Sequence, residues 1–243
     1  MSKIDEYRQA LQITNDWDSF LRENSGLPGP RGNLELAHAV AQEGSREQFN
    51  HFLTYHAEEN TPQVFVFFCG VLGLGKLAAG QPELFNRLRE YASDPRWRVR
   101  EAVATGLQLT GDQDMGLLVR EMKQWSRGNW YEKRAAAAAL AEPRLLKQPK
   151  YARQVLQIMD IITASMEQDE KSREESYRVL RQAMGYCWSV AVAALPEVGK
   201  PMMENWLSSE DRDIRWTMRE NLKKNRLVKI DAAWVKMCLR KLE

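Results

Sequence analysis

The stretch that decides the fold is Ser93-Asp94-Pro95-Arg96-Trp97-Arg98-Val99-Arg100-Glu101-Ala102. Ser93 and Asp94 have side chains that accept hydrogen bonds from the free N–H groups at the start of a helix. Pro95 is tolerated in a first helical turn, where an N–H has no helical partner to lose. The residues that follow have helical spacing and carry an arginine, Arg100. The stretch therefore predicts a capped turn that leads into a helix, and residues 208–211 predict a second one.

Three further segments place an arginine at the same phase of a predicted helix. They are residues 130–137 (WYEKRAAA), 176–183 (SYRVLRQA) and 212–218 (RDIRWTM). The repeated arginines are Arg100, Arg134, Arg181 and Arg215, which lie 34, 47 and 34 residues apart. A repeat of this length is typical of stacked helical hairpins, each of which buries its apolar face only against its neighbours. The sequence thus predicts an all-α chain built as an α-α superhelix, a right-handed solenoid.

Helical periodicity extends through nearly the whole chain, and no long stretch alternates apolar and polar residues as a strand does. Turn signals separate about a dozen expected helices. We expect a single solenoid over residues 1–243. Within it we expect degenerate N-terminal helices over 1–60, repeats over 62–227 and a C-terminal capping helix over 228–243.

Residues 93–102 and 209–215 resemble the D-P-x-x-x-V-R-x-x-A signature of HEAT repeats, whereas the segments around Arg134 and Arg181 lack the Asp-Pro pair. In HEAT repeats this Asp and Arg form a hydrogen-bonded ladder between neighbouring repeats. The resemblance implies that role for Asp94, Arg100, Asp213 and Arg215.

The whole chain also resembles uncharacterised bacterial HEAT-repeat proteins of the armadillo-type class. Residues 68–76 (FCGVLGLGK) and 185–196 (GYCWSVAVAALP) are its most distinctive runs. This resemblance implies a fold and brings no activity with it.

Residues 70–76 (GVLGLGK) have the glycine and lysine spacing of a phosphate-binding loop. Leu77 stands where that loop needs a hydroxyl for magnesium. The apolar residues of 64–77 instead fit one helix that runs through the glycines. We therefore predict no nucleotide site, and expect the glycines to admit a neighbouring helix. The alternative is that the glycines expose the helix backbone to a ligand.

No catalytic or metal-binding constellation is evident in the sequence. The three histidines, His38, His51 and His56, include no pair at the HExxH spacing, and no Cys or His cluster has zinc spacing. No nucleophile elbow or Ser-His-Asp set is present. We expect no metal, no cofactor and no catalytic residues, so an enzyme is not the favoured interpretation.

Composition and cysteine usage indicate the compartment. Charged residues are 28% of the chain, which fits an ordinary globular protein, and the N-terminal segment MSKIDEYRQALQ lacks the apolar core of a secretory signal. No apolar run approaches the ~20 residues that span a bilayer. The three cysteines are sparse, which favours reduced core thiols over disulfides. We expect a cytoplasmic protein that does not enter membranes.

Positive charge gathers at the C-terminal end. Residues 212–243 carry 10 Lys and Arg against 4 Asp and Glu, whereas residues 1–92 carry 8 against 12. A basic stripe is predicted on one helical face by the spacing of Arg215, Arg219, Lys223 and Arg226. A structural alternative is that these cations stabilise their own helix dipole and give the solenoid a polar end.

Arginine and tryptophan on the concave surface of a solenoid can stack on bases, clamp phosphates or anchor a peptide. The alternative is that tryptophan fills gaps between repeats while arginine stems cover the core. The candidate binding residues are Arg181, Trp188, Asp213, Arg215, Trp216, Arg219 and Lys223.

Two functions are compatible with these residues. The first is a non-catalytic interaction scaffold that holds a protein or peptide partner on its concave face. The alternative is DNA binding, because the chain resembles the bacterial HEAT-like alkylated-DNA glycosylases in length, helical plan and Arg/Trp mixture. No run matches that family's catalytic site. A nucleic-acid binder would place Arg181, Arg215, Arg219 and Lys223 on one continuous positive surface, whereas a scaffold would have a mixed groove.

Overall fold

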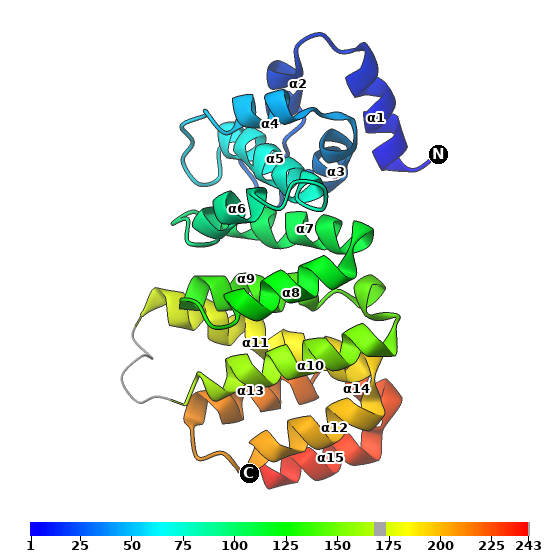
Figure 1. Ribbon diagram of the computed structural model, residues 1–243, viewed down its shortest axis with the longest axis vertical. Helices are drawn as coiled ribbons and strands as arrows, with labels where there is room; N and C mark the ends of the chain where they lie inside the picture. The colour runs from blue at the N-terminus through cyan, green and yellow to red at the C-terminus, as the bar shows by residue number, and fades with distance from the viewer. Residues whose placement is uncertain (168–173, 243) are drawn as a thin grey trace. The chain divides into compact units, whose positions relative to one another are not determined.

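The computed structural model describes residues 1–167 and 174–242, and every regular element within them is helical (Figure 1). This confirms the all-α prediction for the described residues. The chain divides into two compact units, Met1–Asp114 (unit 1) and Met115–Glu243 (unit 2). The superhelical arrangement of one continuous solenoid stays a prediction.

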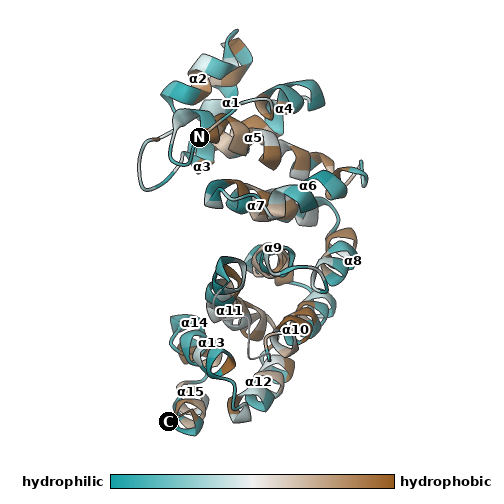
Figure 2. Cartoon of the chain, turned by 90° about the vertical axis from the view of Figure 1, so that its left-hand side faces the viewer, coloured by the Kyte–Doolittle hydropathy of each residue, from teal (hydrophilic) through white to brown (hydrophobic). Residues whose placement is uncertain are grey.

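Unit 1 is built around one fully buried helix. Its helices are α1 (Lys3–Ile13), α2 (Trp17–Glu23), α3 (Leu34–Glu43), α4 (Arg46–Phe52), α5 (Pro62–Leu77), α6 (Leu84–Ala92) and α7 (Trp97–Gln113). All residues of α5 from Val64 to Gly75 are buried, and Figure 2 draws this helix largely in the hydrophobic colour. A helix that is apolar all round needs neighbours on every side. Helices α2, α3, α4, α6 and α7 supply them.

The glycines of α5 lie at helix contacts, as expected from the sequence. A Cβ atom at Gly73 would lie 2.4 Å from the Phe49 ring of α4, and one at Gly75 would lie 2.3 Å from the Gly106 backbone of α7. The Thr110 hydroxyl donates a hydrogen bond of 2.6 Å to the carbonyl oxygen of Gly75. Residues 70–76 therefore form the interior of a packed helix and not a loop that follows a strand.

The start of α7 differs from the predicted cap. The N-cap position is Arg96, one residue beyond the predicted 93–95, and it makes no side-chain cap bond. The Asp94 carboxylate instead accepts the Arg96 backbone N–H at 2.8 Å and forms an ion pair with the Arg96 guanidinium. The cap predicted at 208–211 is confirmed at Asp211, whose side chain accepts the N–H groups of Asp213 and Ile214.

Unit 2 consists of two rows of helices. Its elements are α8 (Met115–Trp125), α9 (Trp130–Leu140), the 3-10 helix η1 (Pro143–Leu146), α10 (Pro149–Ala164), α11 (Glu175–Ala194), α12 (Pro196–Asn205), the 3-10 helix η2 (Trp206–Ser208), α13 (Arg212–Leu222), α14 (Asn225–Ile230) and α15 (Ala232–Lys241). Helices α9, α11 and α13 pack side by side, and α8, α10 and α12 form the second row (Figures 1 and 2). The three repeat segments of this unit fall within α9, α11 and α13, as predicted.

Among the described residues, no helix combines the length and the apolar character needed to cross a bilayer. Cys69, Cys187 and Cys238 are buried and form no disulfide. Burial raises the pKa of the Cys238 thiol to about 11 and also raises the pKa of the Cys69 thiol.

Asp231 joins α12 to the start of α15. Its Oδ1 accepts the Trp234 N–H at 2.9 Å, and Lys200 Nζ donates to its Oδ2 at 2.6 Å. The Lys200 hydrogen bond, followed by the Trp234 N–H, holds the pKa of Asp231 below its ordinary value. Ionised Asp231 therefore stabilises the fold above the unfolded pKa of about 3.9. This stabilisation is lost as the pH falls through the lower folded pKa.

We expect Asp231→Asn to reduce the acid sensitivity of unit 2, because asparagine keeps a cap but cannot lose a charge. Thermal unfolding between about pH 6 and pH 2.5 should show a smaller fall in Tm for the variant than for the wild type. Glu210→Gln removes an exposed carboxylate of the same unit and is the control. If Asp231→Asn and wild type lost Tm equally, the assigned ion pair would be contradicted.

Candidate functional site

Three of the predicted binding residues meet between α11 and α13. The Arg181 guanidinium lies over the Trp216 ring, with its carbon 3.7 Å from the ring centroid. Arg181 Nε also lies 2.6 Å from Asp213 Oδ1 in an ion pair. The face of an indole attracts a cation, and the carboxylate fixes the guanidinium from the other side. Arg181, Asp213 and Trp216 thus form one ordered cluster.

The sequence of α11 makes room for this cluster. Gly185 follows Arg181 by one helical turn, so both lie on the same face of α11. A Cβ atom at Gly185 would lie 3.0 Å from Trp216 Cζ3, which shows that the indole rests on the bare helix backbone. Tyr177 lies one turn before Arg181 and is buried. Burial, and then the nearby Asp213 carboxylate, raise the pKa of the Tyr177 hydroxyl.

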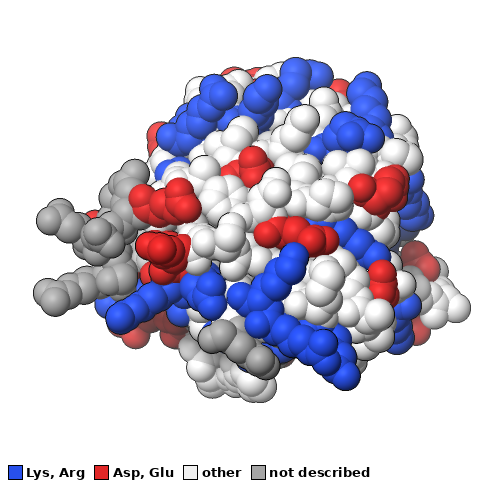
Figure 3. Space-filling view, turned by 90° about the horizontal axis from the view of Figure 1, so that it is seen from below, with Lys and Arg blue, Asp and Glu red and all other residues white. Residues whose placement is uncertain are grey.

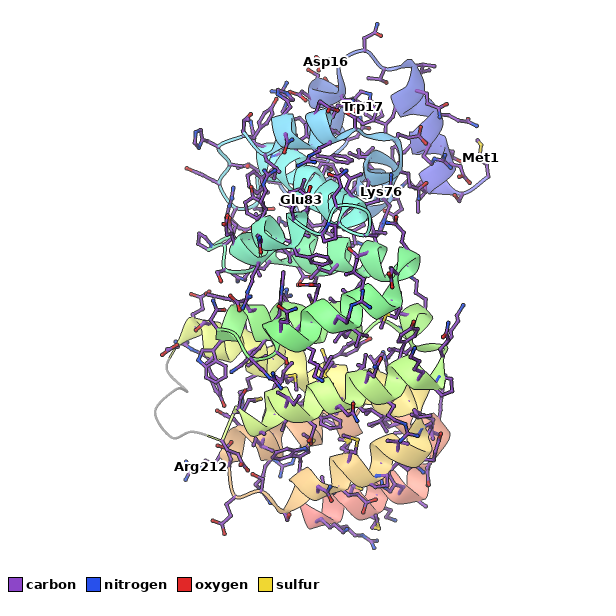
Figure 4. The ribbon with its side chains drawn as sticks, in the orientation of Figure 1. Met1, Asp16, Trp17, Lys76, Glu83 and Arg212 are labelled. Atoms are coloured by element: carbon purple, nitrogen blue, oxygen red, sulfur yellow. The ribbon has the colours of Figure 1, made fainter. Side chains whose placement is uncertain are left out.

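A second stack lies on α11 at Tyr186, five residues after Arg181. Tyr186 is 42% exposed, which leaves its ring accessible to a partner. The Arg226 guanidinium of α14 lies 4.7 Å from the ring centroid and donates a hydrogen bond to the Tyr186 hydroxyl, while Lys224 Nζ lies 5.7 Å from the same ring. We call the surface formed by Arg181, Tyr186, Asp213, Trp216 and Arg226 the Arg/aromatic face. Arg212, labelled in Figure 4, marks the start of α13 next to it.

Arg215 and Arg219 hold the last helix of the chain. Both donate to the carbonyl oxygen of Leu242, at 2.8 Å and 2.6 Å, and Arg215 also donates to Leu207 O at 3.4 Å. The carbonyl groups at a helix C-terminus lack helical partners and carry partial negative charge, so cations stabilise them. Lys223 is exposed and forms an ion pair of 2.6 Å with Glu220. The basic stripe therefore has acceptors within unit 2.

Trp188 lies in the core of unit 2 and not on its surface. Its side chain is fully buried, and its indole N–H donates to the Thr163 hydroxyl at 2.9 Å. An indole in this position cannot stack on a ligand. The structure thus separates Trp188 from the other candidate residues.

The HEAT resemblance implies a hydrogen-bonded ladder between repeats, and the four residues named for it make different contacts. Asp213 pairs across helices, with Arg181 of the preceding repeat segment. Asp94 pairs with Arg96 of its own turn, and Arg100 donates to the carbonyl oxygens of Asp94 and Pro95. These arginines thus support the turn before α7.

Positive and negative side chains are mixed on the surface that Figure 3 shows. This view from below shows Lys and Arg side chains in several groups, with Asp, Glu and neutral residues between the groups. The four basic residues expected to make a continuous positive surface all contact protein groups. Arg181 forms an ion pair with Asp213, and Lys223 forms one with Glu220. Arg215 and Arg219 donate to the Leu242 carbonyl oxygen.

Sequence reasoning missed a polar cluster in unit 1. His51 Nε2 of α4 lies 2.7 Å from Asp18 Oδ2 of α2, and the Tyr55 hydroxyl donates to the same oxygen. That hydrogen bond, followed by burial, raises the pKa of Tyr55. No group of three or more His, Cys, Asp or Glu side chains converges as a metal site in the part of the chain that the structure describes. The cluster joins α2 to the end of α4.

Comparisons with known proteins name no family for this chain. Neither the protein-family models nor the curated proteins contain a match. Among solved structures, one match is described as the crystal structure of an engineered protein. It is 14% identical, covers 98% of each chain and has a TM-score of 0.38. This similarity is too low to assign a fold or a function.

Proposed function

We propose that this chain is a non-catalytic interaction scaffold. In this proposal it is a HEAT-like α-solenoid, and its Arg/aromatic face holds an extended peptide segment of a protein partner. The observation that carries the proposal is the pair of stacks on α11, Arg181 on Trp216 and Arg226 on Tyr186.

Several properties of this face suit a peptide. Arginine, tryptophan and tyrosine are the residues most often responsible for binding energy at protein interfaces. The stacks and the Asp213 ion pair fix these side chains in advance, so little rotamer entropy remains to be lost on binding. The Asp213 and Glu220 carboxylates lie among the cations, which fits a partner with both charges and apolar groups. In a solenoid, the second helix of each hairpin forms the concave binding surface, and α11 and α13 would have that place.

DNA binding is the second candidate, favoured by the same two stacks, because every base has a face that can stack on an aromatic ring. It has less support. Phosphate recognition rests on available cations. Arg215 and Arg219 bind the Leu242 carbonyl, and Arg181 and Lys223 bind carboxylates.

A peptide-display selection on the intact protein, followed by titration of a labelled selected peptide, tests the proposal. We expect Trp216→Ala and Tyr186→Ala each to weaken that peptide by about 10-fold or more. Tyr151→Ala is the matched control, because Tyr151 also lies beneath a cation, Lys150, but on α10. The control should bind like the wild type.

The same titration with labelled duplex DNA at low and physiological salt separates the two candidates. If the protein bound DNA with a steep salt dependence and Trp216→Ala abolished this binding, DNA binding would be the supported function and the scaffold proposal would be rejected. If the selected peptides bound both alanine variants as tightly as the wild type, they would bind at another site, and the proposal for this face would be wrong.

A further inference from the structure

A pocket of about 130 Å³ lies within unit 1. Aromatic walls are contributed by Phe65 and Phe68 of α5 and by Trp97 of α7, and residues 27–34 close the opposite side. The rings of Phe65 and Phe68 are nearly parallel, at 6° and 6.3 Å between centroids. Trp97 is 46% exposed, so its ring stands at the mouth of the pocket.

The wall formed by residues 27–34 is held in place without a ligand. Arg98 Nη2 donates to the Gly29 carbonyl at 2.8 Å and to Asn60 Oδ1 at 3.0 Å. The Gly29 N–H donates to the same Asn60 oxygen at 3.0 Å, and the Asn33 N–H donates to Ser25 O at 2.9 Å. The pocket is therefore preformed, which lowers the free energy needed to order it on binding.

Arg98 lines this pocket and has one buried hydrogen-bond donor without a partner. Its side chain lines the pocket, is 7% exposed, and stacks on the Trp97 ring at 4.4 Å. Arg98 Nε lies 3.4 Å from Glu59 Oε1, and neither atom forms a hydrogen bond. A buried guanidinium donor normally has an acceptor, so the unused Nε–H group points to an acceptor that comes with a ligand.

The size and charge of the pocket limit the class of ligand that it can bind. An apolar cavity of about 150 Å³ holds one benzene molecule, so this pocket has room for one aromatic ring. The Glu59 carboxylate balances the charge of Arg98, so the acceptor on the ligand need not be an anion. A phenol combines an apolar ring with such an acceptor.

We propose that the pocket of unit 1 binds a neutral phenol-type ring, with the ring between Phe65, Phe68 and Trp97 and the oxygen accepting from Arg98. The ring can belong to a free phenolic compound or to a tyrosine side chain of a peptide. This site is independent of the Arg/aromatic face, which lies in unit 2.

Titration of the intact protein with p-cresol, toluene and N-acetyltyrosinamide, followed by calorimetry and by NMR, tests the proposal. p-Cresol should bind about 10-fold more tightly than toluene, because toluene leaves the Arg98 Nε–H donor without an acceptor. N-acetyltyrosinamide that binds at least as tightly as p-cresol would identify a peptide-borne ring as the source. Binding of p-cresol alone would identify a free phenolic compound.

Gly32→Leu is the variant that blocks the pocket. A Cβ atom at Gly32 would lie 3.4 Å from Phe65 Cδ2, an acceptable contact from which a longer side chain can fill the space. Gly80→Leu is the matched control, because a Cβ there meets only Leu77 O, at 3.9 Å. We expect p-cresol to bind at least 10-fold more weakly to Gly32→Leu, which corresponds to a loss of about 1.4 kcal/mol in binding free energy. It should bind to Gly80→Leu as it does to the wild type.

Three outcomes would overturn the proposal: no binding of p-cresol to the wild type, equal binding of p-cresol to Gly32→Leu, or equal affinity for toluene. Thermal unfolding shows whether Gly32→Leu is folded. If it is not, Thr105→Met fills the same pocket from α7 and takes its place in the comparison.

Discussion

Replacing Gly75 by alanine is expected to lower the free energy of unfolding of unit 1 by about 3 kcal/mol. The added Cβ would lie 2.3 Å from the Gly106 carbonyl carbon and 2.4 Å from Gly106 Cα. These atoms belong to the backbone of α7, so no side-chain rotation can remove the overlap. Helix α5 would have to move, and it is packed on its other sides against helices such as α3 and α4. A close-packed interior transmits such a shift instead of absorbing it.

Gly80→Ala is the control for this prediction. A Cβ at Gly80 would make only an ordinary contact, 3.9 Å from Leu77 O, so the main effect is a stiffer unfolded chain, which stabilises by about 0.4–1 kcal/mol. Urea unfolding of both variants, compared at equal m-values, measures the difference. A midpoint for Gly75→Ala equal to that of the wild type would show that α5 and α7 do not approach as closely as the structure places them.

The role of these glycines was predictable from the sequence, but their partners were not. Residues 64–77 are apolar with helical spacing, and Leu77 lacks the hydroxyl that a phosphate loop needs, so the helix followed from local chemistry. Phe49 and Gly106 lie far from α5 in the sequence. Only the packing of three helices brings them to the glycines.

The candidate site shows the same division between local and long-range information. The repeat spacing correctly placed Arg181, Asp213 and Trp216 on two helices, and those helices are neighbours. The destination of Arg215 and Arg219 was not predictable, because the Leu242 carbonyl reaches them only after α14 and α15 fold back. The second stack depends on that same turn of the chain.

Trp188 shows the limit of reading a helix by periodicity. Residues 187–195 are apolar on nearly all faces, so no phase of the helix is marked as exposed. Trp188 lies in the core of unit 2, where Thr163 of α10 provides an acceptor for its indole N–H. A tryptophan that finds such an acceptor can be fully buried.

Replacing Asn221 by leucine is expected to lower the free energy of unfolding of unit 2 by about 3 kcal/mol. Asn221 is fully buried on α13 and faces α11. Its Oδ1 accepts the Ser189 N–H at 2.7 Å, and its Nδ2 donates to the carbonyl oxygens of Met184 at 2.7 Å and Thr217 at 2.8 Å. Leucine has a similar volume, so little cavity forms. It leaves the Ser189 donor without this acceptor, and a buried polar group without a partner costs about 1–3 kcal/mol.

Asn225→Leu makes the same chemical change at an exposed position on α14 and should alter stability by no more than about 0.5 kcal/mol. Hydrogen exchange separates the predicted cause from a general loss of packing. In Asn221→Leu the Ser189 amide should lose protection more than amides on α8, because the amide next to the substitution loses its acceptor. If every amide of unit 2 lost protection equally while the unfolding midpoint fell, the loss would belong to global packing. If the midpoint stayed at the wild-type value, the three hydrogen bonds of Asn221 would not hold α13 to α11.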